Sequence, residues 1–285
     1  MIDLHTHSTA SDGSDSPERL VQLAASLHLQ ALAITDHDTL AGSDLALPAA
    51  AALGLTFVRG IELSTRLLSE PDPTRRSVHI LGYFFAEPGP GFRAWVDSLR
   101  SRRQARNSAL AENLCRHGMN VALEEAEAHA RNITGRPHFA RVLRDKGYAA
   151  SMEEAFRLYL GETGACYVER EDPPPEEAIG RITEAGGVAS LAHPRRLRQT
   201  DPLAEESLIR ALAAAGLGAI EVWHSDHGES HRSRYSHLAR KYNLALTGGS
   251  DYHGDDKPGI LLGRGRNGHR VPLSALDELR RRAGH

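Results

Sequence analysis

The chain has 285 residues, of which 40% are hydrophobic and 25% are charged, and its formal net charge at pH 7 is −3. This composition is typical of a water-soluble globular protein, and the length allows one large domain or a domain with an insert. No stretch approaches the ~20 apolar residues of a membrane span, so no membrane partner is expected, and the slightly negative charge excludes a general attraction to nucleic acid. Two cysteines form no disulfide framework, so we expect a cytoplasmic protein. The unusual count is 16 histidines.

Short apolar runs at regular intervals predict the strands of an α/β fold. Helical periodicity fills most of the intervals between them. The first helix spans 16–27, with Ser16 as its N-cap and Pro17 at its first position, and two more span 202–215 and 230–242. This alternation is typical of a parallel sheet, either open or closed into a barrel. The predicted strands are 2–4, 31–34, 56–58, 78–85, 188–191, 219–222 and 244–246.

The alternation stops in the middle of the chain, where helical periodicity runs through 92–160 without a strand. A further strand is predicted at 166–168, where the sequence begins to return to the barrel-type pattern. We therefore predict a barrel domain over 1–90 and 167–285, interrupted by an all-helical insert over 91–166. The predicted helices of the insert are 92–117, 123–130, 137–146 and 151–160.

Histidines and acidic residues cluster at or just after the predicted strands. The first strand leads into His5 and His7, a spacing that puts both side chains on one face of an extended chain. Any one such motif is equally consistent with exposed polar residues or a satisfied core histidine. Strand ends at one face of an α/β barrel point into a common site, however, so together the motifs predict a metal site. The residues concerned are His5, His7, Asp12, Asp36, His37, Glu62, His79, His193, Glu221, His224, Asp251 and His253.

The motifs "HTHSTASDG", "TDHD", "GIE", "AHP" and "GSDYH", in this order, resemble those of the polymerase-and-histidinol-phosphatase (PHP) family. The resemblance covers the chain apart from its helical stretch. It implies a distorted α/β barrel of seven β/α units, with a site for up to three metal ions. Carried over position by position, the ligands that it implies are His5, His7, Asp12, His37, Glu62, His79, His193, Asp251 and His253.

The family pattern also divides these ligands among the ions, with Glu62 as the bridge between two of them. One ion would take His5, His7, Glu62 and Asp251, a second would take Glu62, His79 and His193, and a third would take Asp12, His37 and His253. The helical stretch with "TGRPHFAR" resembles one branch of the family more closely. Members of that branch are cytoplasmic enzymes that dephosphorylate nucleoside 3′,5′-bisphosphates and also trim short RNA from its 5′ end.

The chemistry of the ligand set indicates a reaction class independently. Histidines and carboxylates without a thiolate suit Mn²⁺, Fe²⁺ or Zn²⁺ rather than Ca²⁺ or Mg²⁺ alone, and we expect about two to three ions, with Mn²⁺ preferred. The positive charge left by the carboxylates matches a phosphate dianion. We expect a phosphate ester to be hydrolysed by a metal-bridging hydroxide. Asp12 and His193 are both candidates for giving a proton to the leaving group, and the sequence does not choose between them.

Three classes of function fit these motifs. The first is a phosphatase that removes the 3′-phosphate of a nucleoside 3′,5′-bisphosphate such as adenosine 3′,5′-bisphosphate. The second is a 5′-3′ exoribonuclease or phosphodiesterase that uses the same site on the ends of short RNA. The third, a non-catalytic metal-binding module, is disfavoured because the ligand set is complete, and histidinol phosphate phosphatase is the near relative to exclude. No obligate protein partner is evident from the sequence.

The residues predicted to contact substrate lie in the barrel and in the insert. Pro137 predicts a helix that begins near Arg136, and the free N–H groups of a helix N-terminus attract anions. Arg136 is therefore predicted to bind the phosphate that is not cleaved, and the insert to act as a substrate-selecting lid. Asp36 is predicted to orient a histidine, and Asp38 to be a solvated loop acid. The predicted substrate contacts are Ser8, Arg136, His138 and His224.

Overall fold

In the computed structural model the chain divides into two compact units. One unit, the barrel unit, consists of Met1–Trp95 and Pro173–His285, and the other, the helical unit, consists of Val96–Asp172. The structure describes residues 1–68, 70, 77–130, 132–169, 171–199, 201–266 and 268–284. Within this described part, no helix combines the length and the apolar character that crossing a membrane requires.

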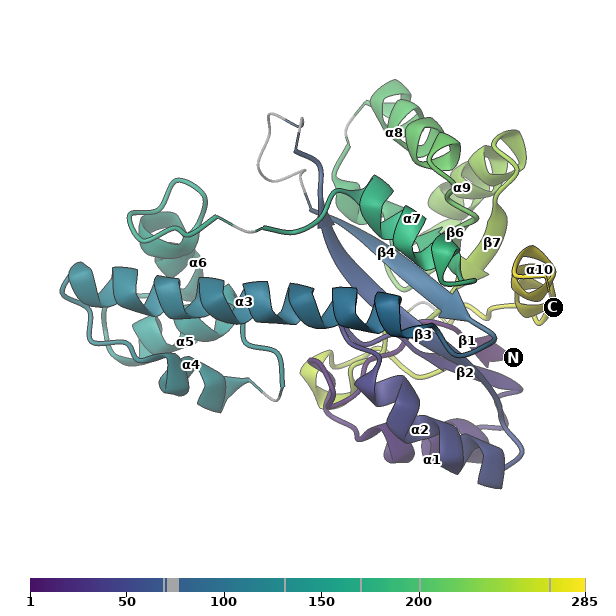
Figure 1. Cartoon of the computed structure of the whole chain (residues 1–285), viewed down its shortest axis with the longest axis horizontal. Helices are drawn as coiled ribbons and strands as arrows, with labels where there is room; N and C mark the ends of the chain where they lie inside the picture. The colour runs from purple at the N-terminus through teal and green to yellow at the C-terminus, as the bar shows by residue number, and fades with distance from the viewer. Residues whose placement is uncertain are drawn as a thin grey trace. The chain divides into compact units, whose positions relative to one another are not determined.

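The barrel unit is organised around one seven-stranded sheet in which the strands lie in chain order, from β1 to β7 (Figure 1). Strands β1 to β3 are parallel to one another, and so are β5 to β7. Strand β4 runs antiparallel to both of its neighbours, so the prediction of a parallel sheet is wrong at this strand. The strands are β1 (Ile2–Asp3), β2 (Ala31–Ile34), β3 (Thr56–Arg66), β4 (Ser77–Phe84), β5 (Val188–Leu191), β6 (Ala219–Trp223) and β7 (Ala245–Gly248).

The segments that follow β1 and β7 pair with each other and bring the two edges of the sheet together. Thr6 and Tyr252 form a parallel bridge. The His7 N–H donates to the Tyr252 carbonyl at 2.8 Å, and the Asp251 N–H donates to the His5 carbonyl at 2.9 Å. Pairing the two edges satisfies backbone groups that an open sheet would leave exposed. The predicted distorted α/β barrel is therefore confirmed.

The helices of the barrel unit bury apolar faces against the sheet. In α1, the Ser16 hydroxyl accepts a hydrogen bond from the Arg19 N–H at 3.2 Å, as expected of the predicted N-cap. Leu20 of the same helix is fully buried in a cluster with Leu32 and Ile34 of β2. Burying each side chain of this size stabilises the fold by about 1.5–3 kcal/mol. The helices are α1 (Pro17–Ser26), α2 (Ala41–Ala52), α7 (Pro175–Glu184), α8 (Pro202–Ala214), α9 (Glu229–Lys241) and α10 (Ser274–Arg282), with short 3₁₀ helices η3 (Pro194–Leu197) and η4 (Gly254–Asp256).

An apolar core fills the barrel at the amino end of its parallel strands. Ile2 and Ala31 come from the first two strands, and Leu276 of α10 packs into the same cluster. Tyr83 belongs to this core as well, and its hydroxyl donates to the Leu4 carbonyl at 3.0 Å, which satisfies the buried oxygen. The polar side chains are consequently collected at the other end, where the parallel strands terminate.

The described secondary structure of the helical unit is entirely helical, and its long first helix, α3, begins in the barrel unit (Figure 1). Leu114 and Phe139 belong to its buried apolar cluster. The strand predicted at 166–168 is wrong. Cys166 lies in a turn, where its N–H donates to the Tyr159 carbonyl at 3.0 Å. Its side chain is buried in this cluster, which explains the apolar signal at this position. The helices are α3 (Pro90–Arg116), α4 (Leu123–His129), α5 (Arg136–Asp145), α6 (Met152–Ala155) and the π-helix η2 (Phe156–Leu160).

Candidate metal centre

His5 and His7 project from the segment that closes the barrel. Both side chains are fully buried, and their ring centroids lie 5.3 Å apart. Their spacing of two residues puts them on the same face of an extended chain, as the sequence predicts. The pairing of this segment with Asp251 and Tyr252 holds the two imidazoles beside the polar residues that follow β7.

Glu62 lies at the centre of the polar end of the barrel and is almost completely buried. One carboxylate oxygen, Oε1, lies 2.8 Å from His79 Nδ1 and 2.8 Å from His193 Nε2. The other, Oε2, lies 3.2 Å from His5 Nε2 and 3.0 Å from His7 Nε2. A carboxylate with imidazoles on both oxygens is suited to bridge two metal ions.

The direction of β4 explains how His79 reaches Glu62. His79 is near the start of β4 and pairs with Ser64 near the end of β3. Because β4 is antiparallel, its amino end lies at the same edge as the carboxyl ends of the parallel strands. A histidine early in β4 thus enters the same site as His193, which follows β5.

A second part of the site is more open to solvent. The side chain of Asp12 is 40% exposed, and its Oδ1 lies 3.4 Å from His7 Nδ1 and 3.4 Å from His253 Nε2. Its Oδ2 lies 3.9 Å from His37 Nε2. These residues form a cluster with the composition expected of a metal site, at the mouth of the barrel.

The structure brings together all the ligands that the family resemblance implies. They fall into overlapping groups whose ligand atoms lie within 4.8 Å of one another. Four buried imidazole nitrogens in these groups lie 3.0–3.5 Å from a carboxylate oxygen without the geometry of a hydrogen bond, namely His7 Nε2, His37 Nδ1, His224 Nε2 and His253 Nε2. Buried polar atoms are normally satisfied, so these nitrogens fit bound metal ions. The groups are His7, Asp12, His37 and His253; His5, His7 and Asp251; His5, Glu221 and His224; His5, Glu62 and His193; and His37, Glu62 and His79.

The ionisation of the centre suits metal binding at three of the predicted ligands and opposes it at two others. Burial acts to raise the pKa of Glu62, but the surrounding histidines, His37 first, hold that pKa well below its usual range. Burial lowers the pKa of His193 to about 3 and the pKa of His37 to about 4. At neutral pH the carboxylate is therefore charged and these two imidazoles are neutral, which are the forms that bind a metal ion. Against the effect of burial, Glu221 and Glu62 instead raise the pKa of His5, and Asp12 and Glu62 raise the pKa of His7 to about 9, so these two imidazoles must release a proton to bind an ion.

The motif analysis places Glu221 at the metal site, and the structure shows that it orients two of the predicted ligands. Its carboxylate is fully buried, and its Oε1 accepts a hydrogen bond from His5 Nδ1 at 3.0 Å. Its Oε2 accepts from the backbone N–H of His193 at 2.7 Å. Glu221 therefore orients two predicted ligands at once, and it also belongs to a possible ligand group with His224. Its position in the strand-ending motif "EVWHS" is the signal that pointed to it.

Two cations that no motif singles out also reach the centre. Arg196 Nη2 donates to Asp251 Oδ2 at 2.8 Å, and Lys257 Nζ donates to the same oxygen at 2.9 Å. Burial acts to raise the pKa of Asp251, but Lys257 and the neighbouring histidines hold it well below its usual range. The centre thus carries positive charge from side chains as well as from any bound ion.

The two acids of "TDHD" differ from the expectations. The Ser8 hydroxyl donates to Asp36 Oδ2 at 2.6 Å, and the contact of Ser8 with a phosphate stays a prediction. Asp36 also accepts from the Ser11 hydroxyl at 2.6 Å, and it therefore organises the loop after β1 instead of orienting a histidine ring. The expectation that Asp38 is solvated is wrong, because it is buried and accepts from the Ser64 N–H at 2.8 Å.

The remaining predicted substrate contacts lie in both units. His224 is fully buried, and its Nε2 lies 3.5 Å from Asp251 Oδ2 in the metal centre. In the helical unit, α5 begins at Arg136 as predicted. The Arg136 guanidinium donates to the Leu160 carbonyl at 3.2 Å, and His138 Nδ1 accepts from the Gly135 N–H at 3.0 Å. The substrate contacts of Arg136 and His138 stay predictions.

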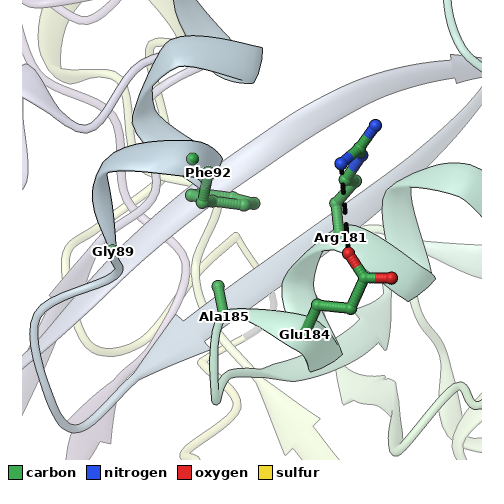
Figure 2. A pocket seen from close by; sticks show the side chains of 6 residues that line it. Gly89, Phe92, Arg181, Glu184 and Ala185 are labelled. Atoms are coloured by element: carbon green, nitrogen blue, oxygen red, sulfur yellow. Dashed lines mark ion pairs between the residues drawn. The ribbon is translucent and has the colours of Figure 1, made fainter.

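A separate pocket of about 330 Å³ lies between the start of α3 and the end of α7 (Figure 2). Phe92 of α3 lines one side of it. Arg181 and Glu184 of α7 line the other side and form an ion pair at 4.0 Å (Figure 2). Because α7 leads into the amino end of β5, this pocket is at the opposite end of the barrel from the metal centre. Its lining includes none of the predicted ligands.

The barrel and its clusters of histidines and carboxylates define the class of this protein: an α/β barrel with a candidate metal centre where the strands end. Its sequence matches the PHP domain over residues 3–173, and the chain belongs to the PHP family. The family resemblance drawn from the motifs is thereby confirmed.

Several characterised relatives align with most of the chain. A phosphoribosyl 1,2-cyclic phosphate 1,2-diphosphodiesterase of Eggerthella lenta is 36% identical over 88% of this chain and 94% of its own length. A 3′,5′-nucleoside bisphosphate phosphatase of Chromobacterium violaceum is 34% identical over 92% of this chain and 90% of its own length. The 5′-3′ exoribonuclease Rnm of Salmonella typhimurium is 36% identical over 93% of this chain and 88% of its own length.

Solved structures resemble the fold over nearly its whole length. A protein of Bifidobacterium adolescentis, described as a candidate metal-dependent phosphoesterase, superposes with a TM-score of 0.79 at 30% identity, covering 99% of this chain and 96% of that one. A Chromobacterium violaceum protein described as an amidohydrolase with bound sulfate superposes with a TM-score of 0.77 at 31% identity, covering 97% and 96%.

Proposed function

We propose that this protein is a metal-dependent phosphoesterase whose ions are held by the clusters at the polar end of the barrel. The observation that carries the proposal is Glu62, a buried carboxylate within 3.2 Å of four imidazole nitrogens. Burying so many ionisable groups together is costly, and bound divalent ions would offset that cost. The relatives of the chain include two kinds of phosphodiesterase and a phosphatase, which supports the same class.

Bound divalent ions would activate a water molecule and neutralise the charge that builds on the phosphoryl group. The chain's own residues prepare the site for that chemistry. Glu62 and Asp251 remain carboxylates at neutral pH, and Glu221 fixes the rotation of the His5 ring. Asp12, at the open mouth, and His193, deeper in the centre, remain the two candidates for proton transfer to the leaving oxygen.

We further propose that the substrate is a nucleoside 3′,5′-bisphosphate, such as adenosine 3′,5′-bisphosphate, and that the 3′-phosphate is removed. The support is the bisphosphate phosphatase from Chromobacterium violaceum, which aligns with 92% of the chain. Hydrolysis of short RNA from its 5′ end is the second candidate, because the exoribonuclease Rnm aligns with 93% of the chain. Both reactions use a phosphate ester and the same ligands, with Mn²⁺ as the proposed ion.

A panel of substrates tests the proposal. The purified protein would be assayed with added Mn²⁺ on adenosine 3′,5′-bisphosphate, short 5′-phosphorylated RNA, histidinol phosphate and a cyclic phosphodiester, with metal content measured by elemental analysis. We expect phosphate release from the bisphosphate and incorporation of ¹⁸O from labelled water into that phosphate. No hydrolysis of any ester, together with less than about one equivalent of metal, would overturn it.

A further inference from the structure

Arg196 and Lys257 approach the metal centre from two loops at the carboxyl ends of the strands. Arg196 lies in η3, which follows β5, and Lys257 directly follows η4, beyond β7. Both donate to Asp251 Oδ2, at 2.8 Å and 2.9 Å. Two cations far apart in the sequence therefore meet on one carboxylate oxygen.

The other oxygen of Asp251 belongs to the candidate metal ligands. Asp251 Oδ1 lies 3.6 Å from His5 Nε2 and 3.6 Å from His7 Nε2, and these residues form one of the ligand groups. Glu62 and Glu221 also contact His5, so three carboxylates face this group. Together they carry less charge than two divalent ions, a guanidinium and an ammonium would bring. Asp226 offsets part of this excess by accepting from Arg196 Nε at 2.8 Å. The remaining positive charge calls for an anion from outside the protein.

The two cations are also accessible and partly held in place. The side chains of Arg196 and Lys257 are 38% and 32% exposed, whereas Asp251 beneath them is 2% exposed. The contact with Asp226 restrains the guanidinium, so less side-chain entropy is lost when it binds an anion. Arginine and lysine are the side chains that most often bind phosphate groups.

We propose that Arg196 and Lys257 form a subsite for the second phosphate of the substrate, the one that is not cleaved; this inference rests on the proposed function. The cleaved phosphate would lie among the ligand atoms on the Oδ1 side of Asp251. The two cations lie on the Oδ2 side and face solvent, so they select substrates in which a second phosphate is a few ångströms from the first. The barrel unit then contributes to substrate choice as well as to the chemistry.

The test compares two substrates that share the 3′-phosphate. Metal-loaded Arg196→Ala and Lys257→Ala variants would be assayed on adenosine 3′,5′-bisphosphate and on adenosine 3′-monophosphate. We expect the ratio of the two kcat/KM values to fall by about 10- to 100-fold in each variant. Arg198→Ala is the matched control, because it removes the same charge from an exposed position in the same loop. An unchanged ratio in both variants, with both rates reduced equally, would overturn the subsite.

A binding measurement separates failure of the subsite from failure of the proposed function. Adenosine 5′-monophosphate carries only the second phosphate, and its affinity for the Mn²⁺-loaded protein would be measured with saturating inorganic phosphate present. We expect Arg196→Ala to weaken this binding by about tenfold or more without lowering the metal content. Weakened binding in a protein that hydrolyses no ester would refute the function and leave the subsite standing. Unchanged binding in an active enzyme would refute the subsite alone.

Discussion

The barrel unit and the helical unit bury different kinds of side chain. In the barrel unit, His5, His7 and Glu221 are all fully buried, and His7 Nε2 makes no hydrogen bond of good geometry although it lies 3.0 Å from Glu62 Oε2. In the helical unit, the buried cluster is apolar and includes Leu114 and Phe139, and the buried polar side chains of its described part are those of Arg106 and Asn107. Each buried polar group without a partner costs about 1–3 kcal/mol, so a fold retains such groups where a ligand compensates the cost. The difference indicates that the chemistry belongs to the barrel unit.

We expect the largest effect on activity from Glu62→Gln in the barrel unit. The amide lacks the charge that faces four imidazole nitrogens and cannot bridge two ions as a carboxylate does. We expect kcat for phosphate ester hydrolysis to fall by about 10³-fold or more, measured by phosphate release with added Mn²⁺. Glu184→Gln, at the opposite end of the barrel, is the matched control. A nearly normal kcat in Glu62→Gln would mean that the chemistry takes place elsewhere.

Metal removal should destabilise the barrel unit more than the helical unit. An ion that binds only the folded state at 100 times its Kd stabilises by about 2.7 kcal/mol, which raises Tm by about 5–10 °C in a protein of this size. Calorimetry with chelator and with added Mn²⁺ measures the shift. Identical thermograms under the two conditions would show that the clusters hold no ion.

Glu221→Gln tests whether the orientation of the ligands matters. The amide oxygen can still accept one hydrogen bond, but the NH₂ group cannot accept the second from His5 or His193. Loss of such an orienting partner typically weakens metal binding by about 10- to 100-fold, and we expect that loss in a Mn²⁺ titration. The exposed Glu229, changed to Gln, provides the control. Wild-type affinity would restrict Glu221 to a structural role.

The smallest effect is expected from Arg136→Ala in the helical unit. A large effect of this variant would contradict the assignment of substrate choice to the barrel unit. Its guanidinium already donates to the Leu160 carbonyl and lies over the rings of Phe156 and Tyr167. We expect the kcat/KM ratio for adenosine 3′,5′-bisphosphate over the 3′-monophosphate to change by less than about threefold. Arg141→Ala, on the exposed side of the same helix, is the control.

A fall of more than tenfold in that ratio would instead support the prediction that Arg136 binds the second phosphate. The helical unit would then act as the substrate-selecting lid that the sequence predicts. A similar fall in Arg196→Ala and Arg136→Ala would divide substrate selection between the two units.

Local signals in the sequence predicted much of the fold and of the site. Ser16 and Pro17 predicted the start of α1, and Pro137 predicted the start of α5, because caps and first-turn residues act over a few positions. The strand 31–34 followed from a short apolar run and matches β2. Apolar pattern alone failed at 166–168, because a buried turn and a buried strand need the same kind of residue.

The ligand types at the strand ends can be read from the amino-acid order, since His5, His7 and the later motifs follow short apolar runs directly. The antiparallel direction of β4, the hydrogen bond between Glu221 and His5, and the contact of Arg196 with Asp251 became visible in the folded chain. The two kinds of feature differ in the sequence distance over which they arise. Caps and strand periodicity depend on neighbours a few residues away, whereas strand direction and contacts between loops depend on how distant segments pack around a shared core.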